Sequence, residues 1–120
     1  MFNIIFYKDK KGNEPVKDYI VSLKLQDTKD SAIKLSKIQD YLNVLRQNGI
    51  RSGKPYVKYI DGEIWELRPL KDRILFLACD GKNLILLSHF RKSTRKIPKR
   101  ELDKAKRLKN DYKERSKSNE

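Results

Sequence analysis

Residues 73–90, RILFLACDGKNLILLSHF, contain two long apolar runs separated by Asp80-Gly81. Each run, 73–79 and 83–90, has the length of a β-strand, and an Asp-Gly pair between two such runs is a strong signal for a hairpin turn. Neither run alternates between apolar and polar residues, so both faces of the two strands are expected to be buried. The segment therefore predicts an antiparallel pair at the centre of a sheet that is covered on both sides.

Strand-like and helix-like segments flank this hairpin. Strands are expected at 2–7 and 63–67, and helices over about 14–25, from a cap at Asp27-Thr28 to Gly49, and over about 98–115. Residues 49–55 read as a loop and 116–120 as a tail that frays. The order β-α-α-β-β-β-α predicts an α+β fold, with helices packed on a small twisted antiparallel sheet, in a single domain spanning 1–120.

The composition excludes several classes of protein. The longest apolar run, 74–79, is far shorter than the roughly 20 residues that span a bilayer. Residues 1–8 have neither the basic start nor the cleavage site of a signal peptide. With one cysteine, Cys79, the chain has no internal disulfide, and with one histidine a structural zinc site is not expected. We expect a soluble cytoplasmic protein with no metal, cofactor or membrane partner, and a buried, inert Cys79.

Positive charge is concentrated near the end of the chain. The formal net charge is +13, from 29 Lys and Arg against 16 Asp and Glu, and residues 91–120 contribute +8 of it. The stretch 91–100 contains no acidic residue and carries six cations: Arg91, Lys92, Arg95, Lys96, Lys99 and Arg100. Such a local cluster indicates a site for an acidic partner, with nucleic acid as the leading candidate.

Two further arginines are expected near this cluster. Arg68 ends one strand and Arg73 begins the next, so pairing across the turn brings both to one end of the sheet. His89 and Phe90 end the following strand. Cations with a histidine and an aromatic ring suit a phosphodiester, because charge builds up on the phosphoryl oxygens during its cleavage. The alternative is a solvated basic face, and the acidic turn 61–63 is expected to be solvated as well.

Several blocks of the sequence, taken in order, resemble one known group of proteins. Residues 62–68, GEIWELR, resemble the dG-x-W-E-L-R segment of the RelE/ParE superfamily of toxins, and RILF at 73–76 followed by Asp80-Gly81 fits the same pattern. Residues 86–98, LLSHFRKSTRKIP, are similar to the L-L-H-x-F-x-K-K-T-x-K-T-P block of the phage-derived, HigB-like branch. The matching blocks lie within about 56–112.

This resemblance implies the toxin of a type II toxin–antitoxin system. HigB-like members cleave mRNA on the translating ribosome, and a helix-turn-helix antitoxin of the HigA type neutralises them, here implied to form a heterotetramer with the toxin. The family's RNA-facing arginines correspond to Arg68 and Arg73, its two lysines to Lys92 and Lys96, and its aromatic residue to Phe90.

One departure from the family pattern concerns the histidine. The family histidine often follows the Leu-Leu pair directly, whereas Ser88 stands there in this chain and the histidine is one position later, at His89. In a strand, a shift of one position turns a side chain to the opposite face. This shift predicts that His89 does not occupy the place of the family's catalytic histidine.

The leading hypothesis is metal-free RNA cleavage by attack of the 2′-hydroxyl on the adjacent phosphate. The catalytic set would be Arg68, Arg73, Lys92, Lys96 and His89, with Lys92, Lys96 or His89 as the base. The RNA-binding set would be Phe90, Arg91, Arg95, Lys99 and Arg100, helped by the basic last helix. The alternatives are a ParE-like inhibitor of DNA gyrase and a basic RNA- or ribosome-binding protein without enzymatic activity.

Overall fold

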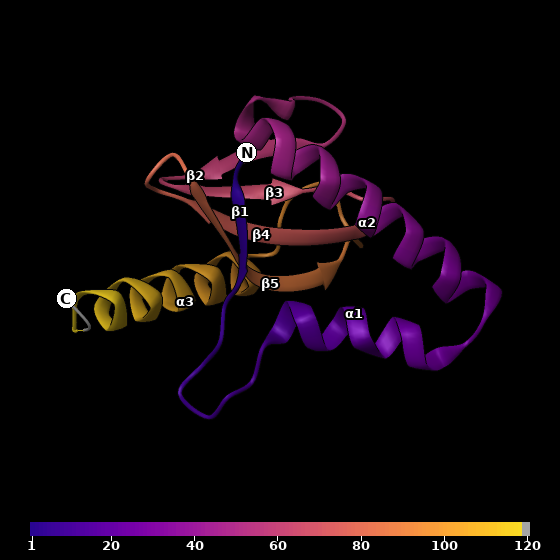
Figure 1. The fold of residues 1–120 in the computed structure, drawn as a ribbon, viewed down its shortest axis with the longest axis horizontal. Helices are drawn as coiled ribbons and strands as arrows, with labels where there is room; N and C mark the ends of the chain where they lie inside the picture. Colours follow the sequence, from indigo (N-terminus) through magenta and orange to yellow (C-terminus); the bar gives the residue numbers. More distant parts are fainter. Residues whose placement is uncertain (119–120) are drawn as a thin grey trace.

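The α+β fold is confirmed by the computed structural model, which describes residues 1–118 (Figure 1). The elements follow in the order β1 (Asn3–Phe6), α1 (Pro15–Gln26), α2 (Lys29–Asn48), the 3-10 turn η1 (Gly49–Ser52), β2 (Val57–Asp61), β3 (Ile64–Leu67), β4 (Asp72–Ala78), β5 (Asn83–Arg91) and α3 (Lys99–Ser118).

The five strands described between residues 1 and 118 form one mixed sheet in the order β1-β5-β4-β3-β2. The β4–β5 hairpin lies at its centre, and β2, β3, β4 and β5 pair with one another in antiparallel fashion. The expectation of an entirely antiparallel sheet is wrong for β1, which pairs with β5 in parallel. Two helices and three strands separate β1 from β5 along the chain, so no hairpin dictates the direction of β1.

Strand β2 was not predicted, because charged residues interrupt its apolar pattern. Lys58 and Asp61 lie within it, and the register with β3 shifts between Tyr59 and Asp61. Such a bulge breaks the alternation by which a strand is recognised in a sequence. The strand nevertheless extends the sheet by one edge and brings Lys58 opposite Glu66 of β3.

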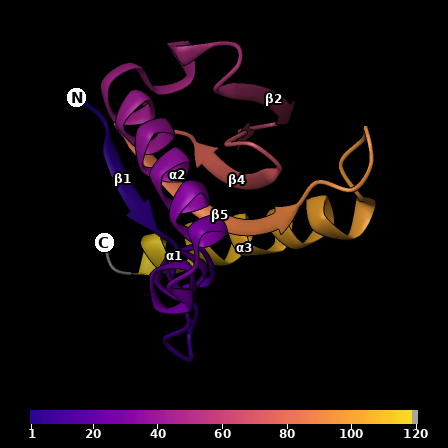
Figure 2. The ribbon, with the colours of Figure 1, turned by 90° about the vertical axis from the view of Figure 1, so that its right-hand side faces the viewer.

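Apolar side chains bury both faces of the sheet, as the two long apolar runs predict. On one face α1 and α2 pack over β4 and β5, with Val16, Ile38, Leu45, Ile74, Phe76 and Leu86 in the core. On the other face α3 packs over the same strands, with Leu75, Leu77, Ile85, Leu87 and Ala105 in the core. Figure 2 shows the helices arranged around β4 and β5 from the side. The sheet therefore has an α1/α2 face and an α3 face.

The ends of α2 follow the sequence closely. Thr28 caps the helix by accepting a hydrogen bond from the Ser31 backbone N–H at 3.0 Å, and the Ser31 hydroxyl accepts one from the Thr28 N–H. Gly49 ends α2 with a φ of +58°, and its N–H donates to the Leu45 carbonyl. Within residues 1–118, no helix has both the length and the apolar composition needed to cross a membrane.

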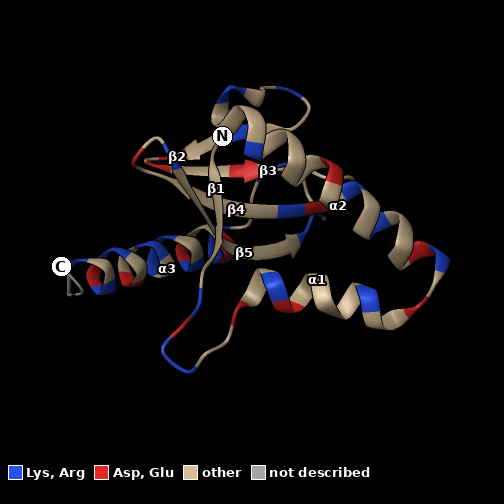
Figure 3. Ribbon diagram, in the orientation of Figure 1, with Lys and Arg blue, Asp and Glu red and all other residues tan. Residues whose placement is uncertain are grey.

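Helix α3 is longer than expected, because it continues to Ser118 and so includes most of the tail predicted to fray. Residues 119–120 of that tail lie outside the described residues. Lysines of α3 form ion pairs with the acidic turn between β2 and β3: Lys106 with Asp61 at 2.9 Å, and Lys109 and Lys113 with Glu63. The turn that was expected to be simply solvated therefore fastens α3 to the sheet. Figure 3 shows acidic residues interspersed among the more numerous basic residues of α3.

Gly49 lies against the first strand, and this contact makes a testable prediction. A Cβ added at Gly49 would lie 2.7 Å from the Phe2 ring, in addition to the strain of a positive φ. We expect Gly49→Ala to lower the free energy of unfolding by about 2–4 kcal/mol in urea denaturation.

Gly81→Ala is the matched control, because Gly81 also has a positive φ but no atom within 4 Å of the added Cβ. It should cost only about 1 kcal/mol. Equal losses in the two variants would show that the packing of Phe2 on Gly49 is not tight.

Candidate functional site

A bulge in β5 decides which side chains of the last strand share a face. Leu75 pairs with Ser88 and Phe76 with Leu86, so Leu87 is an extra residue in β5. Beyond the bulge the alternation is reversed: His89 pairs with Ile74 of the α1/α2 face, and Phe90 pairs with Arg73. His89 and Phe90 therefore project from opposite faces of the sheet.

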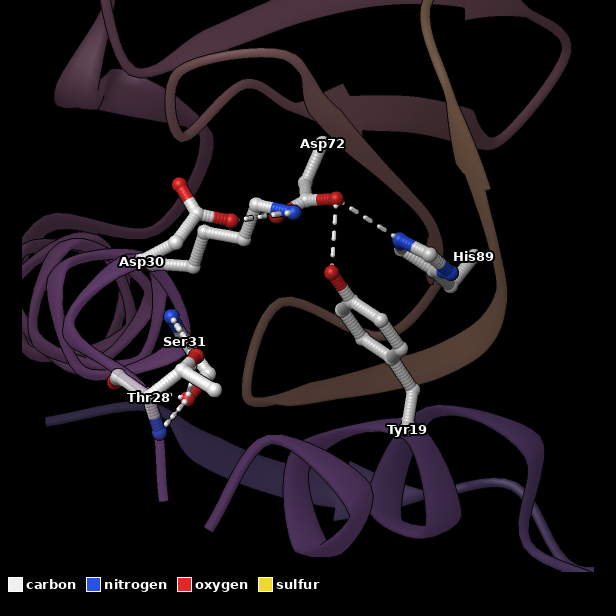
Figure 4. Close-up of polar contacts among 7 residues, drawn as sticks. Tyr19, Thr28, Asp30, Ser31, Asp72 and His89 are labelled. Carbon is white, nitrogen blue, oxygen red and sulfur yellow. Dashed lines mark hydrogen bonds and ion pairs between the residues drawn. The ribbon is translucent and has the colours of Figure 1, made fainter. Parts of the chain in front are cut away.

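His89 lies on the α1/α2 face, where it holds α1 against the sheet. Its ring stacks on that of Tyr19 with 3.6 Å between centroids, and its Nε2 lies 3.0 Å from Oδ1 of Asp72 (Figure 4). The Tyr19 hydroxyl donates to the same oxygen at 2.9 Å. These three side chains connect α1, β4 and β5 through one buried carboxylate.

The ionisation of this group is shifted by its surroundings. Burial alone would raise the pKa of Asp72, but the hydrogen bonds from His89 and Tyr19 outweigh it and hold the pKa below the ordinary value of 3.8. Burial, followed by the hydrogen bond to Asp72, raises the pKa of Tyr19. Asp72 is therefore held as a carboxylate and Tyr19 as a neutral donor.

A small cationic cavity lies on the opposite face, beyond the N-terminal end of α3. Its volume is about 40 Å³, and its lining residues are Lys58, Ile60, Glu66, Arg68, Arg73, Phe90, Lys92, Thr94, Arg95, Lys96 and Ile97. A wider hollow of about 490 Å³ adjoins it and shares Arg73, Lys92, Thr94 and Arg95 with it. We refer to these two hollows as the cationic cavity and the adjoining groove.

The structure brings together six of the ten residues that the sequence predicted for the site. Arg68, Arg73, Lys92, Lys96, Phe90 and Arg95 all line the cationic cavity. His89, Arg91, Lys99 and Arg100 do not lie among its lining residues. Arg91 borders a separate hollow beside α2, Lys99 is exposed at the start of α3, and Arg100 contacts Glu101 at 3.7 Å.

Arg73 is the most rigidly held cation of the cavity. It is only 6% exposed, and its Nη1 donates to the carbonyls of Leu70 and Asp72, both at 2.8 Å. Burial lowers the pKa of the guanidinium. Leu70 has a φ of +57°, a left-handed conformation that costs a leucine about 1–3 kcal/mol. This strained turn presents the Leu70 carbonyl to Arg73 and so fixes the guanidinium at the cavity wall.

Glu66 places a carboxylate among these cations. It is 6% exposed, and its Oε1 lies 3.3 Å from Nε of Arg68 and 3.7 Å from Nε of Arg73. Burial raises the pKa of Glu66 against the opposing effect of both arginines. Ionisable groups with a shifted pKa cluster at functional sites, and this makes Glu66 a candidate site residue of the cavity.

The loop after β5 closes the cavity with exposed cations. The Lys92 N–H donates to the Lys71 carbonyl at 2.8 Å, and the Thr94 hydroxyl donates to the Lys96 carbonyl at 2.7 Å. Lys92, Arg95 and Lys96 are exposed, whereas Arg73 beneath them is buried. The cavity thus has a rigid, buried wall and a solvated rim.

The position of Cys79 differs from the one predicted. Cys79 is exposed, because it follows the last residue of β4 at the hairpin turn, so the prediction of a buried thiol is wrong.

Five residues that line the cavity were not predicted from the sequence: Lys58, Ile60, Glu66, Thr94 and Ile97. Glu66 stands two positions before Arg68, which directly follows β3, and in an extended segment this spacing puts both side chains on one face. Lys58 and Ile60 carry no such signal, because their strand was not predicted.

Comparison with known families identifies the chain. Residues 24–110, well over half of the sequence, match the family described as phage derived protein Gp49-like (DUF891). The protein belongs to this family, which is part of the RelE-type group of toxin-like proteins. Membership in such a family implies an antitoxin partner in general terms. No curated protein matches the sequence. Within residues 1–118, no group of three or more His, Cys, Asp or Glu side chains is placed to hold a metal ion.

The cationic cavity should bind inorganic phosphate. Because Lys92 and Lys96 contribute charge at its rim, replacing both with alanine should weaken phosphate binding about tenfold at low ionic strength, measured by calorimetric titration. Lys17→Ala, which removes an exposed cation of α1, is the control and should bind as the wild type does. Equal affinity in all three proteins would contradict a phosphate site here.

The buried Asp72 predicts a pH dependence of stability. Because its folded-state pKa lies below 3.8, its contribution is fully present above that pH and is lost as the pH falls through the folded-state value. Asp72→Asn should therefore lower the free energy of unfolding by about 1–3 kcal/mol at neutral pH. The difference between variant and wild type should shrink in acid, and a difference that does not change with pH would contradict this role.

Proposed function

We propose that the protein is the toxin of a type II toxin–antitoxin system and an endoribonuclease that cleaves mRNA on the ribosome. The observation that carries this proposal is the cationic cavity, where Arg68, Arg73, Lys92 and Lys96 converge beside the Phe90 ring. Fixed cations suit a phosphodiester, whose charge grows on the phosphoryl oxygens in the transition state. Membership in the Gp49-like family supports a toxin, and the resemblance of residues 86–98 to HigB-like toxins supports mRNA as the substrate.

In the proposed reaction the 2′-hydroxyl of the RNA attacks the adjacent phosphate. The products are a 2′,3′-cyclic phosphate and a free 5′-hydroxyl. Arg73 binds a phosphoryl oxygen from the buried wall, and Arg68 binds from its position directly after β3. Lys92 and Lys96 at the exposed rim neutralise further negative charge on the phosphoryl group. One of them protonates the leaving 5′-oxygen.

The remaining contacts hold the RNA strand on either side of the scissile phosphate. The adjoining groove shares Arg73, Lys92, Thr94 and Arg95 with the cavity. The RNA backbone can therefore continue from the cavity into the groove, where the next phosphate would bind. Phe90 offers a ring for base stacking. Arg91, Lys99 and Arg100 lie outside the cavity and are proposed to contact more distant phosphates.

The proposed setting follows from the same resemblance. The protein would act as a single domain, residues 1–120, in the cytoplasm, where its substrate is the translated message. Its partner would be a helix-turn-helix antitoxin of the HigA type, in a heterotetramer with the toxin. The proposed chemistry uses side chains alone, and no cofactor is assigned to it.

Cleavage of mRNA during translation tests the proposal. In primer extension on programmed ribosomes, the wild type should cut the message, and Arg68→Ala and Lys96→Ala should each lower the rate about 10²-fold or more. Lys17→Ala should cleave at the wild-type rate. Thermal unfolding of each variant checks that the fold is retained.

The alternatives predict different results. A ParE-like toxin would leave the message intact and block supercoiling by purified DNA gyrase. A non-enzymatic binder would neither cleave the mRNA nor block supercoiling by gyrase. It would associate with ribosomes in a salt-dependent manner. Intact mRNA in the presence of wild-type protein would overturn the proposed ribonuclease.

A further inference from the structure

Glu66 occupies an unusual position in the cationic cavity. Its strand β3 lies between β2 and β4, so Lys58 pairs with it on one side and Leu75 on the other. Only 6% of the residue is exposed, although it lines the cavity. Of the cavity's lining residues, Glu66 is the one that carries a carboxylate.

A carboxylate at this position works against simple binding of phosphate. Its negative charge repels the phosphoryl oxygens that the surrounding cations attract. If the cavity served only to hold a phosphate, a neutral residue would give stronger binding. The presence of Glu66 is explained if the group receives a proton during the reaction, because it then becomes neutral as negative charge develops on the phosphate.

The contacts of Glu66 leave it available for this role. Both arginines approach the same oxygen, Oε1, at 3.3 and 3.7 Å, which is longer than a charge-assisted hydrogen bond. Arg73 directs its Nη1 to the carbonyls of Leu70 and Asp72 instead. Burial raises the pKa of Glu66, which makes it a stronger base than an exposed glutamate.

The other groups of the cavity are less suited to accept a proton. Arginine does not deprotonate in proteins, which excludes Arg68, Arg73 and Arg95. Lys58, Lys92 and Lys96 are exposed to solvent, whereas it is burial that makes a lysine available as a base. His89 lies on the opposite face of the sheet, engaged with Tyr19 and Asp72. Glu66 is thus the remaining acid–base group inside the cavity.

We propose that Glu66 is the general base of the RNA cleavage, an inference that rests on the proposed function. The Glu66 carboxylate takes the proton of the 2′-hydroxyl while the 2′-oxygen forms a bond to phosphorus. The bond between phosphorus and the 5′-oxygen breaks, and a rim lysine gives a proton to that oxygen. One proton is taken up and one is delivered, so the step balances without a further reactant.

The experiment compares wild type, Glu66→Gln and Glu63→Gln on ribosomes programmed with a short mRNA. Glu66→Gln should lower the cleavage rate about 10²- to 10⁴-fold. The wild-type rate should rise with pH through a pKa above the ordinary 4.5 of glutamate, and this rise should vanish in Glu66→Gln. Glu63, which pairs with Lys109 and Lys113 of α3, provides the matched control and should tolerate glutamine.

A second substrate separates the base from the acid. With sulfur in place of the bridging 5′-oxygen, the leaving group departs without a proton, so the loss caused by Lys96→Ala should diminish. The loss caused by Glu66→Gln should persist, because the 2′-hydroxyl still needs a base. The Gln variant should also bind a 2′-deoxy analogue of the message at least as tightly as the wild type does, because a repulsive charge has been removed.

Each contrary outcome is distinct. If the wild type cleaves and Glu66→Gln cleaves equally well, Glu66 is not the base although the proposed function stands. If the Gln variant instead binds the 2′-deoxy analogue more weakly and keeps the wild-type pH profile, Glu66 only positions the arginines. If the wild type cleaves neither substrate, the proposed function and the general base are both rejected.

Discussion

The pairing of β4 with β5 contains one irregularity on which the arrangement of the site depends. An extra residue at Leu87 reverses the alternation of β5, so that His89 joins the α1/α2 face and Phe90 lies beside Arg73 on the other. The histidine and its partners Tyr19 and Asp72 then serve to hold α1 on the sheet. The opposite face holds the cations and the buried carboxylate of Glu66, so the bulge separates the His89 cluster from the cationic cavity.

The positive charge of the chain divides in a similar way. Lys106, Lys109 and Lys113 of α3 pair with the acidic turn between β2 and β3, so part of the charge excess fastens the last helix to the sheet. The cations of the cavity have a different environment, because they face a hollow and share a single carboxylate, Glu66. A high net charge by itself therefore locates no site. The placement of acidic partners decides which cations remain available to a ligand.

Much of the fold could be predicted from the sequence. The apolar runs at 73–79 and 83–90 require a hairpin whose two faces are both covered by other elements. The meeting of Arg68 and Arg73 followed from their places at the ends of paired strands. Strand β2 and the parallel pairing of β1 could not be predicted, since bulges and long-range strand direction leave no periodic trace. The spacing of Glu66 from Arg68 predicts that the two side chains share a face. The burial of Glu66 could not be predicted, because a charged residue in a short strand is usually exposed.

The central claim is that RNA is bound and cleaved on the α3 face, around Glu66, and not at the histidine. The most direct test is an NMR titration of isotopically labelled protein with a short 2′-deoxy analogue of mRNA, which cannot react because it lacks the attacking hydroxyl. The account predicts that the signals of Glu66, Arg73 and Phe90 shift while those of Tyr19 and His89 do not. Shifts centred on Tyr19 and His89, with the cavity signals unchanged, would contradict it.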